Sequence, residues 1–353
     1  MAERSGLILA IESSCDETAL AIVEGGRRIH ANVVASQASL HAVTGGIVPE
    51  VAARAHLRWM LPVLERTVAD AGLDDWAALE AVAVTEGPGL AGSLIVGITL
   101  AKTLAFLHDL PLVPVNHHEG HIYAAWLLDP GEADRDPPSF PLVALVVSGG
   151  HTFLVEMRDH LDYRLLGQTV DDAAGEAFDK VGRLLGLPYP GGPAIQRAAA
   201  EATARDRRFP RAWMGERGDF SFSGLKTAVR RSVTDEAGGT ADDGVSLPPG
   251  LVAEVAWAFQ DAVVDVLATK TARAAEATRA RAIVLGGGVA ANSALRGRVA
   301  ELADGMGVPL IVPRPGLCTD NGAMIGAAGF RRARAGARAG FDLDARPSLK
   351  LAS

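Results

Sequence analysis

The sequence is poor in cysteine and in long apolar runs, and each shortage excludes a class of protein. Cys15 and Cys318 are the two cysteines of the chain and stand about 300 positions apart, so there is no disulfide framework like that of small secreted domains. No apolar run reaches the roughly 18 residues of a membrane span, and residues 7–11 are too short for the hydrophobic part of a signal peptide. We therefore expect a soluble, cytoplasmic protein.

The chain also lacks an excess of positive charge. Its formal net charge is −8, which argues mildly against a protein that binds nucleic acid by itself. Arginines gather at residues 205–211 and 331–338, but such clusters are more often solvated faces than RNA-binding sites. A hydrophobic fraction of 48% is typical of a folded globular protein, and 353 residues exceed the usual size of one domain. Two domains that share a cleft are the first expectation.

Short apolar runs alternate with stretches of helical periodicity, which is typical of an α/β protein. A strand, a polar turn and a second strand occur twice, at residues 8–23 and 143–157, so we expect two similar lobes. A polar, proline-rich stretch at 129–138 connects them. The lobes are expected at residues 1–128, completed by 321–353, and at 139–320 with a helical insertion.

The helix predicted at residues 51–71 contains Pro62, which we expect to interrupt it. The remaining helices are predicted at residues 92–107, 171–187, 251–280 and 292–303, and the strands at 7–11, 18–23, 81–85, 112–115, 141–147, 152–157 and 282–285.

Three glycine-rich turns each follow a predicted strand, at residues 86–89, 148–150 and 286–288. Glycine lets backbone N–H groups approach a phosphate closely. One such turn alone is usually just a tight turn, but three in a two-lobed α/β chain favour a nucleotide cleft. None matches the P-loop or the dinucleotide-binding pattern, so neither of those sites is supported.

His117 and His121 are four residues apart, so on a helix they share a face and could bind one metal ion. A zinc protease would place its general base directly after the first histidine. Here Glu119 is two residues on, which turns it roughly 200° around the helix and away from the ion. The geometry therefore disfavours a protease.

A metal site with two histidines needs a third ligand. Asp320, in an acidic turn before an apolar helix, would complete a set of two histidines and one carboxylate that suits Fe(II) or Zn(II). Paired histidines are also common on polar surfaces, so the residues alone leave both roles open. Asp172, Glu176 and Asp179 follow one helical face, which is either an ordinary acidic surface or a set of acceptors for ribose hydroxyls.

Nine blocks in chain order resemble the TsaD family, formerly called glycoproteases, and they cover nearly the whole chain. At position 116 the family more commonly has histidine, whereas this chain has asparagine; His117 and His121 are both retained. The blocks are residues 11–18, 45–50, 87–90, 117–121, 147–152, 171–180, 220–227, 286–292 and 318–322.

The resemblance implies the two-lobed ASKHA fold of actin and hexokinase, with two RNase H-like lobes around a nucleotide cleft. It implies that His117, His121 and Asp320 bind one divalent metal ion, usually described as iron, with zinc as the alternative. The positions that would contact the threonylcarbamoyl-AMP co-substrate are Val146, Val147, Ser148, Gly149, Gly150, Asp179, Gly192 and Asn292.

The family transfers the threonylcarbamoyl group to N6 of adenosine 37 in tRNAs that read ANN codons and releases AMP. In bacteria it works with a TsaB-like paralogue and a TsaE-like ATPase, and a TsaC-like enzyme supplies the adenylate. We hypothesise that Asp16 or Glu17 accepts the N6 proton, and the sequence does not separate the two. A TsaB-like partner is expected to dock on a helix such as 51–71, while residues 331–353 carry no motif that we can assign.

Three other functions compete with the transferase. An ATP phosphotransferase on the same fold would phosphorylate a small substrate. A metalloprotease is weakened by the position of Glu119. A nucleotide-gated scaffold would bind nucleotide without transfer. The order of the nine blocks favours the transferase.

Overall fold

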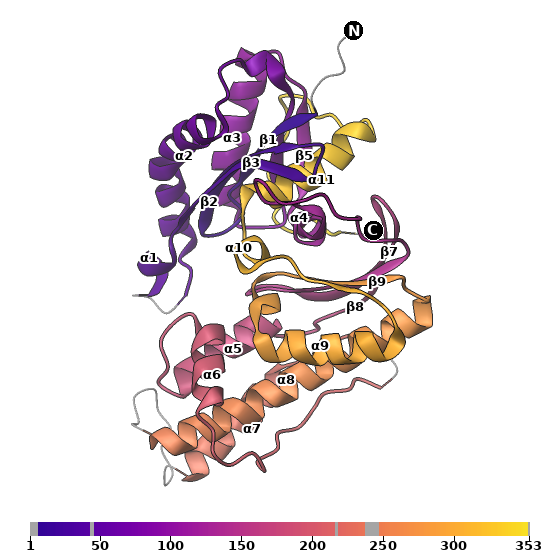
Figure 1. The fold of residues 1–353 in the computed structure, drawn as a ribbon. Helices are drawn as coiled ribbons and strands as arrows, with labels where there is room; N and C mark the ends of the chain where they lie inside the picture. Colours follow the sequence, from indigo (N-terminus) through magenta and orange to yellow (C-terminus); the bar gives the residue numbers. More distant parts are fainter. Residues whose placement is uncertain (1–5, 43–45, 216–217, 237–246, 352–353) are drawn as a thin grey trace. The chain divides into compact units, whose positions relative to one another are not determined.

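A computed structural model describes residues 6–42, 46–215, 218–236 and 247–351 (Figure 1). Gly45, which opens one of the family blocks, and residues 352–353 at the C-terminus lie outside them. The chain divides into two compact units, Met1–Pro138 with Pro313–Ser353, and Ser139–Val312. Residues 313–320 group with the first unit, whereas the sequence prediction assigned them to the C-terminal lobe; the lobe boundaries stay a prediction.

The first unit is built on a five-stranded sheet in the order β3-β2-β1-β4-β5. A hairpin of β1 (Leu7–Glu12) and β2 (Glu17–Glu24) is extended on one side by β3 (Arg28–Ser36). On the other side β4 (Leu79–Gly87) and β5 (Leu112–Asn116) run parallel to β1. The carboxyl ends of β1, β4 and β5 therefore meet at one edge, where α/β sheets bind ligands.

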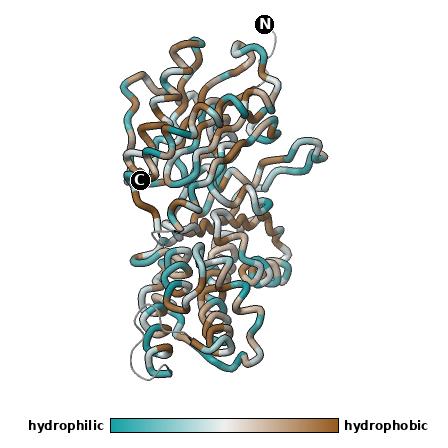
Figure 2. Tube along the Cα trace, turned by 90° about the vertical axis from the view of Figure 1, so that its left-hand side faces the viewer, coloured by the Kyte–Doolittle hydropathy of each residue, from teal (hydrophilic) through white to brown (hydrophobic). Residues whose placement is uncertain are grey.

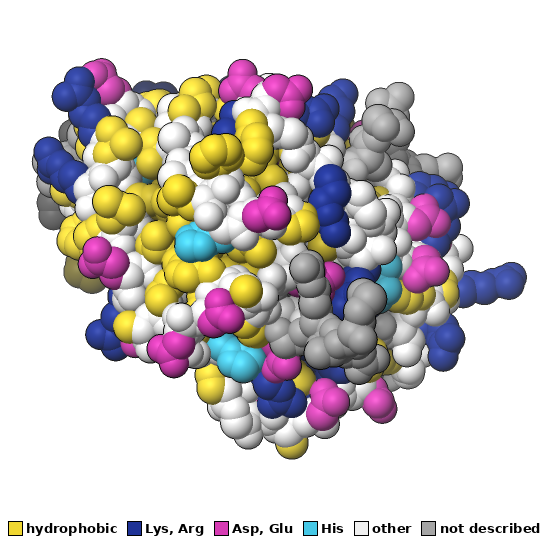
Figure 3. Space-filling model, turned by 90° about the horizontal axis from the view of Figure 1, so that it is seen from above, with side chains coloured by type: hydrophobic (Ala, Val, Ile, Leu, Met, Phe, Trp, Pro, Cys, Tyr) yellow, Lys and Arg dark blue, Asp and Glu magenta, His cyan; other side chains and the backbone are white. Residues whose placement is uncertain are grey.

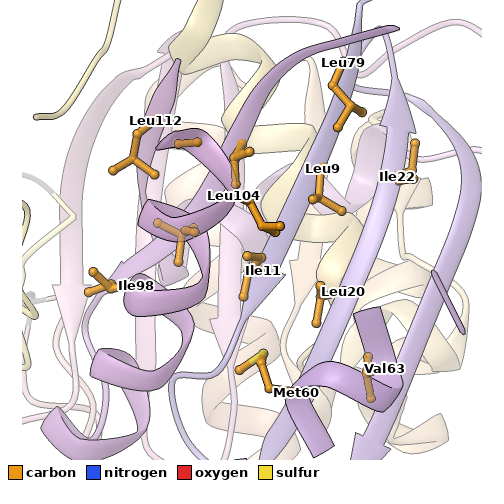
Figure 4. Packing of buried hydrophobic residues seen from close by; sticks show 14 of the residues in the cluster. Leu9, Ile11, Leu20, Ile22, Met60, Val63, Leu79, Ile98, Leu104 and Leu112 are labelled. Carbon is orange, nitrogen blue, oxygen red and sulfur yellow. The ribbon is translucent and has the colours of Figure 1, made fainter. Parts of the chain in front are cut away.

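Helices cover both faces of this sheet (Figure 1). Leu9 and Ile11 of β1 point to the side of α2 (Pro49–Ala71) and α3 (Ala91–Leu107), in the apolar core of Figure 4. The alternate residues of β1 face α11 (Gly322–Arg334). A Cβ atom at Gly329 would stand 2.5 Å from Cβ of Ala83, so glycine lets this helix lie directly on the sheet.

The expected interruption of α2 at Pro62 is wrong. The helix runs on through this proline to Ala71. Pro62 lies on the exposed face, where the carbonyl that loses its N–H partner can be hydrated. Shorter helices of this unit are α1 (Ala38–Ala42), η1 (Trp76–Ala78), α4 (His117–Tyr123), η2 (Ala124–Trp126) and α10 (Pro315–Cys318).

The second unit repeats the topology of the first, with the strand order β10-β9-β6-β7-β8. The hairpin of β6 (Leu142–Val147) and β7 (Thr152–Asp159) is extended by β8 (Asp162–Gln168), and β9 (Ala282–Gly286) runs parallel to β6. This confirms the expected duplication. The remaining elements are β10 (Leu310–Ile311), α5 (Ala174–Leu184), α6 (Gly191–Ala200), α7 (Ser223–Glu236), α8 (Pro249–Thr278), η3 (Gly288–Ala291) and α9 (Ser293–Met306).

Hydrophobic stretches follow the inner strands and helix faces of each unit, and the loops are largely hydrophilic (Figure 2). Among the described residues, no helix combines the length and the apolarity that crossing a membrane requires.

Candidate functional site

The edge where β1, β4 and β5 end carries most of the polar groups buried in the first unit. Helix α4 begins here, directly after β5, at His117. Asn116 caps it, because its side-chain oxygen accepts the N–H of His118 at 2.9 Å. The short link from strand to helix fixes where the histidines of α4 stand.

The structure brings His117, His121 and Asp320 together, as the sequence predicted. Asp320 Oδ1 lies 3.5 Å from Nε2 of His117 and 3.2 Å from Nε2 of His121. One ligand atom from each residue lies within 4.8 Å of the others. Asp320 comes from the turn before α11, whose first turn is capped by Asn321.

These three side chains fit a metal ion. Donor atoms bound at 2.0–2.2 Å stand about 3.0–3.4 Å apart, close to the spacing between Asp320 and each histidine. His121 is 1% exposed, and within the described residues neither of its ring nitrogens makes a hydrogen bond. Its Nε2 lies within ion-pair distance of Asp320, but without hydrogen-bond geometry. An unpartnered buried nitrogen is costly, and a metal ion would satisfy Nε2. Two nitrogens and one oxygen suit Fe(II) or Zn(II) with open positions.

Negative charge gathers around this set. Burial would lower the pKa of His117, but the carboxylates of Asp320 and Glu12 outweigh burial and raise this pKa to about 9. Burial above all, together with the charges of Asp320 and Asp16, raises the pKa of Glu17 to about 10. A cation bound beside Asp320 would relieve this repulsion.

Glu119 faces away from the three ligands, as predicted. Its carboxylate pairs with the guanidinium of Arg332 on α11, at 2.5 Å from Nε and 3.0 Å from Nη2. Glu119 therefore cannot act as the general base of a zinc protease, and its negative charge is neutralised inside the first unit.

Sequence analysis missed Glu12, the last residue of β1. Its carboxylate is fully buried and lies 3.0 Å from Nδ1 of His117 and 2.6 Å from the hydroxyl of Thr85. Burial would raise the pKa of Glu12, but the charge of His117 outweighs it and holds this pKa below its usual value. The sequence signal that could have identified Glu12 is a glutamate at the end of an otherwise apolar strand.

The first glycine-rich turn contacts the chain's own C-terminal segment. The N–H of Gly89 donates to the carbonyl of Pro347 at 3.1 Å, and a Cβ atom at Gly87 would lie 1.9 Å from the carbonyl oxygen of Arg346. The N–H of Leu90 donates to Ser14. The close approach that glycine permits here is to backbone, so the expectation of a phosphate cradle is wrong for this turn.

The second and third turns lie side by side in the second unit, because they end the neighbouring parallel strands β6 and β9. The space beside Gly149 and Gly150 is open, since no atom lies within 4 Å of a Cβ added there. Gly287 has a φ of +84° and packs directly on Val147. The second turn thus has room for a ligand, and the third turn packs against the end of β6, the strand that leads into the second turn.

The other positions expected to contact the adenylate also belong to the second unit. Asp179 accepts the N–H of Gly191 at 2.7 Å and so holds the start of α6, where the space beside Gly192 is open. Asn292 caps α9 through Leu295 and donates to Oε1 of Gln260 at 2.8 Å. Val146 and Val147 are buried within β6. As ligand contacts, all of these residues stay predictions.

The acidic stretch at 171–180 has structural partners. Helix α5 begins at Ala174, so Asp171 and Asp172 precede it. Lys180 lies 2.8 Å from Asp172 and 2.6 Å from Glu176. These pairs favour an ordinary charged surface over a ribose site for Asp172 and Glu176.

The two arginine clusters are also largely paired. Arg207 binds Glu236 at 2.6 Å, and Arg211 binds Asp261 and Asp265. In the second cluster Arg332 pairs with Glu119, and Arg334 with Glu80. This agrees with the expectation that the clusters are not RNA sites by themselves.

The chain matches the TsaD family, described as tRNA N6-adenosine threonylcarbamoyltransferase, over residues 28–327. A protein of that name from Thermomicrobium roseum is 53% identical over 98% of this chain and 97% of its own length. Another from Symbiobacterium thermophilum is 51% identical, with the same coverage.

Solved structures support the fold. The HypF protein of T. kodakarensis matches with a TM-score of 0.60 at 14% identity, over 95% of this chain and 48% of HypF. Component A of the (R)-2-hydroxyglutaryl-CoA dehydratase of Acidaminococcus fermentans matches with a TM-score of 0.51 at 13% identity, over 94% of this chain and 99% of its own. These likenesses show the ASKHA fold alone, whereas the high identity to the curated relatives shows the family. The chain belongs to the TsaD family, the tRNA N6-adenosine threonylcarbamoyltransferases.

Proposed function

We propose that this protein transfers the threonylcarbamoyl group from threonylcarbamoyl-AMP to N6 of adenosine 37 in tRNAs that read ANN codons. The observation that carries the proposal is 53% identity to a named transferase over almost the full chain, with the set of His117, His121 and Asp320 assembled within it. The N6 nitrogen forms a bond to the carbamoyl carbon, the bond from that carbon to the phosphate oxygen breaks, and AMP leaves with the electron pair. The N6 proton must pass to a base.

His117, His121 and Asp320 would hold one divalent ion, which we propose to be Fe(II), with Zn(II) as the alternative. Such an ion would supply positive charge and a template for anionic oxygen atoms.

The residues of the second unit would bind the adenylate. Backbone N–H groups at Gly149 and Gly150 would hold the negative charge that develops on the transferred group and on the departing phosphate. The N–H of Ser148 already donates to the carbonyl of His151 at 2.8 Å. The open space beside these glycines supports this role. Asp179 and Asn292 keep the starts of α6 and α9 in place around the ligand, together with Gly192, Val146 and Val147.

Asp16 and Glu17 are the proposed proton acceptors, and the structure supports Asp16 over Glu17. A pKa of about 10, caused first by burial, keeps Glu17 protonated at neutral pH in the metal-free protein. A protonated carboxyl group cannot accept the N6 proton. Single-turnover transfer should therefore fall strongly in Asp16→Asn and much less in Glu17→Gln; the reverse order would assign the role to Glu17.

The proposed partners are tRNA, a TsaB-like paralogue and a TsaE-like ATPase, with the adenylate supplied by a TsaC-like enzyme in the cytoplasm. Helix α2 exposes Leu57, Trp59 and Leu61, and α3 exposes Phe106 and Leu107. Hydrophobic side chains gather on the face of the first unit seen in Figure 3. Exposed apolar groups of this size are typical of protein interfaces, which supports docking of the paralogue on α2 and α3.

The test is transfer of labelled threonylcarbamate from its adenylate to an unmodified ANN-reading tRNA, with the partners present. Wild type should modify the tRNA, and His117→Ala and Asp320→Ala should lose transfer while staying folded. Asp136→Ala, at an exposed position of the first unit outside α2 and α3, is the matched control and should keep it. Wild-type protein that binds metal and adenylate but transfers nothing would support a phosphotransferase or a scaffold instead.

A further inference from the structure

We propose that Glu12 is a positioning residue for the metal ion: its carboxylate orients His117 and fixes the tautomer that presents Nε2 to the ion. The inference rests on the proposed metal site and adds to it a residue that does not itself bind the ion. It concerns only side chains of the first unit.

Glu12 is buried in the core, and hydrogen bonds satisfy its carboxylate. Its side chain is 0% exposed, and three donors converge on it: Nδ1 of His117 at 3.0 Å, the hydroxyl of Thr85 at 2.6 Å and the N–H of Ser14. A buried carboxylate is tolerated only when such donors satisfy it. This arrangement exists because β1 and β4 run parallel and end together, with α4 starting at the end of the next strand.

These contacts decide which nitrogen of His117 carries a proton. An ionised carboxylate only accepts hydrogen bonds, so Nδ1 must donate to Glu12. The hydroxyl of Ser14, 3.2 Å from the same nitrogen, can share that hydrogen. With the proton on Nδ1, the lone pair of the neutral ring is on Nε2, the atom that faces Asp320 at 3.5 Å. A carboxylate behind a ligand histidine also raises its basicity toward a metal ion.

The second histidine has no such support. Within the described residues, neither Nδ1 nor Nε2 of His121 makes a hydrogen bond. The two ligands are therefore unequal. Glu12 holds His117 in one orientation before an ion arrives and keeps the proton on Nδ1 when the ion displaces the one on Nε2, whereas within the described residues no hydrogen bond orients His121.

A purely structural role for Glu12 makes a different prediction. If Glu12 only ties the ends of β1 and β4 together, its loss lowers stability and leaves metal affinity of the folded protein unchanged. If Glu12 orients His117, affinity falls as well, by about 10–100-fold as for other supporting carboxylates. Thr85→Val is the matched control, because it removes one donor from the same carboxylate and leaves its contact with His117 in place.

The experiment measures the Kd for Co(II) and for Zn(II) by chelator competition, in the full-length chain without tRNA or adenylate. We expect Glu12→Gln to bind each ion about 10–100-fold more weakly and Thr85→Val to stay within about threefold of wild type. A folded Glu12→Gln protein with wild-type Kd overturns the proposal. An equal loss in both variants also overturns it, and so does a wild type that binds neither ion.

A second measurement needs no variant of Glu12, in case that protein fails to fold. The ¹⁵N resonances of the histidine rings in the wild-type zinc complex report the tautomer directly, with His117 assigned by its loss in His117→Gln. We expect a proton on Nδ1 and zinc on Nε2. Zinc on Nδ1 overturns the proposal. Neither the metal affinity nor the ring tautomer depends on transfer. If both come out as expected and the transferase assay fails, the proposed function is rejected and the role of Glu12 stands.

Discussion

The side-chain amide of Asn116 joins the helix of the ligand histidines to the C-terminal segment of the chain, because its Nδ2 donates to the carbonyl of Lys350 at 3.1 Å. Its Oδ1 accepts the N–H of His118 and caps α4. An amide group has both an acceptor and a donor for these two contacts. The C-terminal residues, which carry no recognisable motif, thus help to place the metal ligands.

The two contacts of Asn116 can be separated by substitution. Asn116→Ala loses both and should lower the free energy of unfolding by about 1–2 kcal/mol. Asn116→Asp keeps an N-cap acceptor and lacks the donor to Lys350, so it should lose less. Urea unfolding measures both. Asp75→Ala, which removes the cap of the exposed helix η1, is the control for loss of a cap away from the site. Equal stability of Asn116→Ala and wild type would contradict this account.

The pair of Glu119 and Arg332 should behave as a buried ion pair. The side chain of Glu119 is 4% exposed and that of Arg332 is 24% exposed. Arg332→Met would leave a buried carboxylate without its partner, at a cost of about 3 kcal/mol. The double variant Arg332→Met, Glu119→Gln should recover part of this loss, since no uncompensated charge remains. Chemical unfolding of the two variants checks the order, and a double variant less stable than Arg332→Met would contradict it.

The metal-free protein should lose stability as the pH rises. The pKa of His117 in the folded protein is about 9, above the roughly 6.5 of an unfolded histidine. The protonated ring therefore stabilises the fold fully below about pH 6.5, and this contribution disappears as the pH rises through 9. Glu17, whose pKa rises from 4.5 to about 10, acts in the same direction.

Unfolding in the presence of a chelator, between about pH 6.5 and 8.5, measures this slope. The stabilisation that bound zinc provides should increase with pH over the same range, because the ion must displace a proton from His117. His117→Gln should flatten part of the chelator profile. A chelated wild type whose stability rises with pH in this range would refute the assignment.

Most elements around the site could be predicted from sequence, because β1, β4 and β5 are apolar runs and α4 carries its histidines four residues apart. Strands β3 and β8 could not, since both are half-exposed and show no continuous apolar run.

Partners far apart in the chain were equally hidden. Arg332 meets Glu119 across 213 residues, and Glu12 meets His117 across 105. No local pattern records such pairs. The link of Asp320 to the histidines likewise came from the family resemblance, because spacing alone left it open.

Asp171 gives a prediction for the second unit, at acid pH. Its carboxylate accepts the hydroxyls of Ser221 and Ser223 at 2.6 Å each and the N–H of Phe222 at 2.8 Å, and so fixes the start of α7. Partial burial would raise the pKa of Asp171, but these hydrogen bonds outweigh it and lower the pKa below its ordinary value. Asp171→Ala should cost about 1–2 kcal/mol at neutral pH.

The cost should shrink with acid. A lowered pKa means that Asp171 contributes its full stability above the roughly 3.9 of an unfolded aspartate and loses it as the pH falls through the folded-state value. Free energies of unfolding for wild type and Asp171→Ala should therefore converge below about pH 4. Asp136→Ala, at an exposed position of the first unit, should follow wild type throughout. A gap between wild type and Asp171→Ala that stays constant down to acid pH would show that the carboxylate charge is not what holds α7.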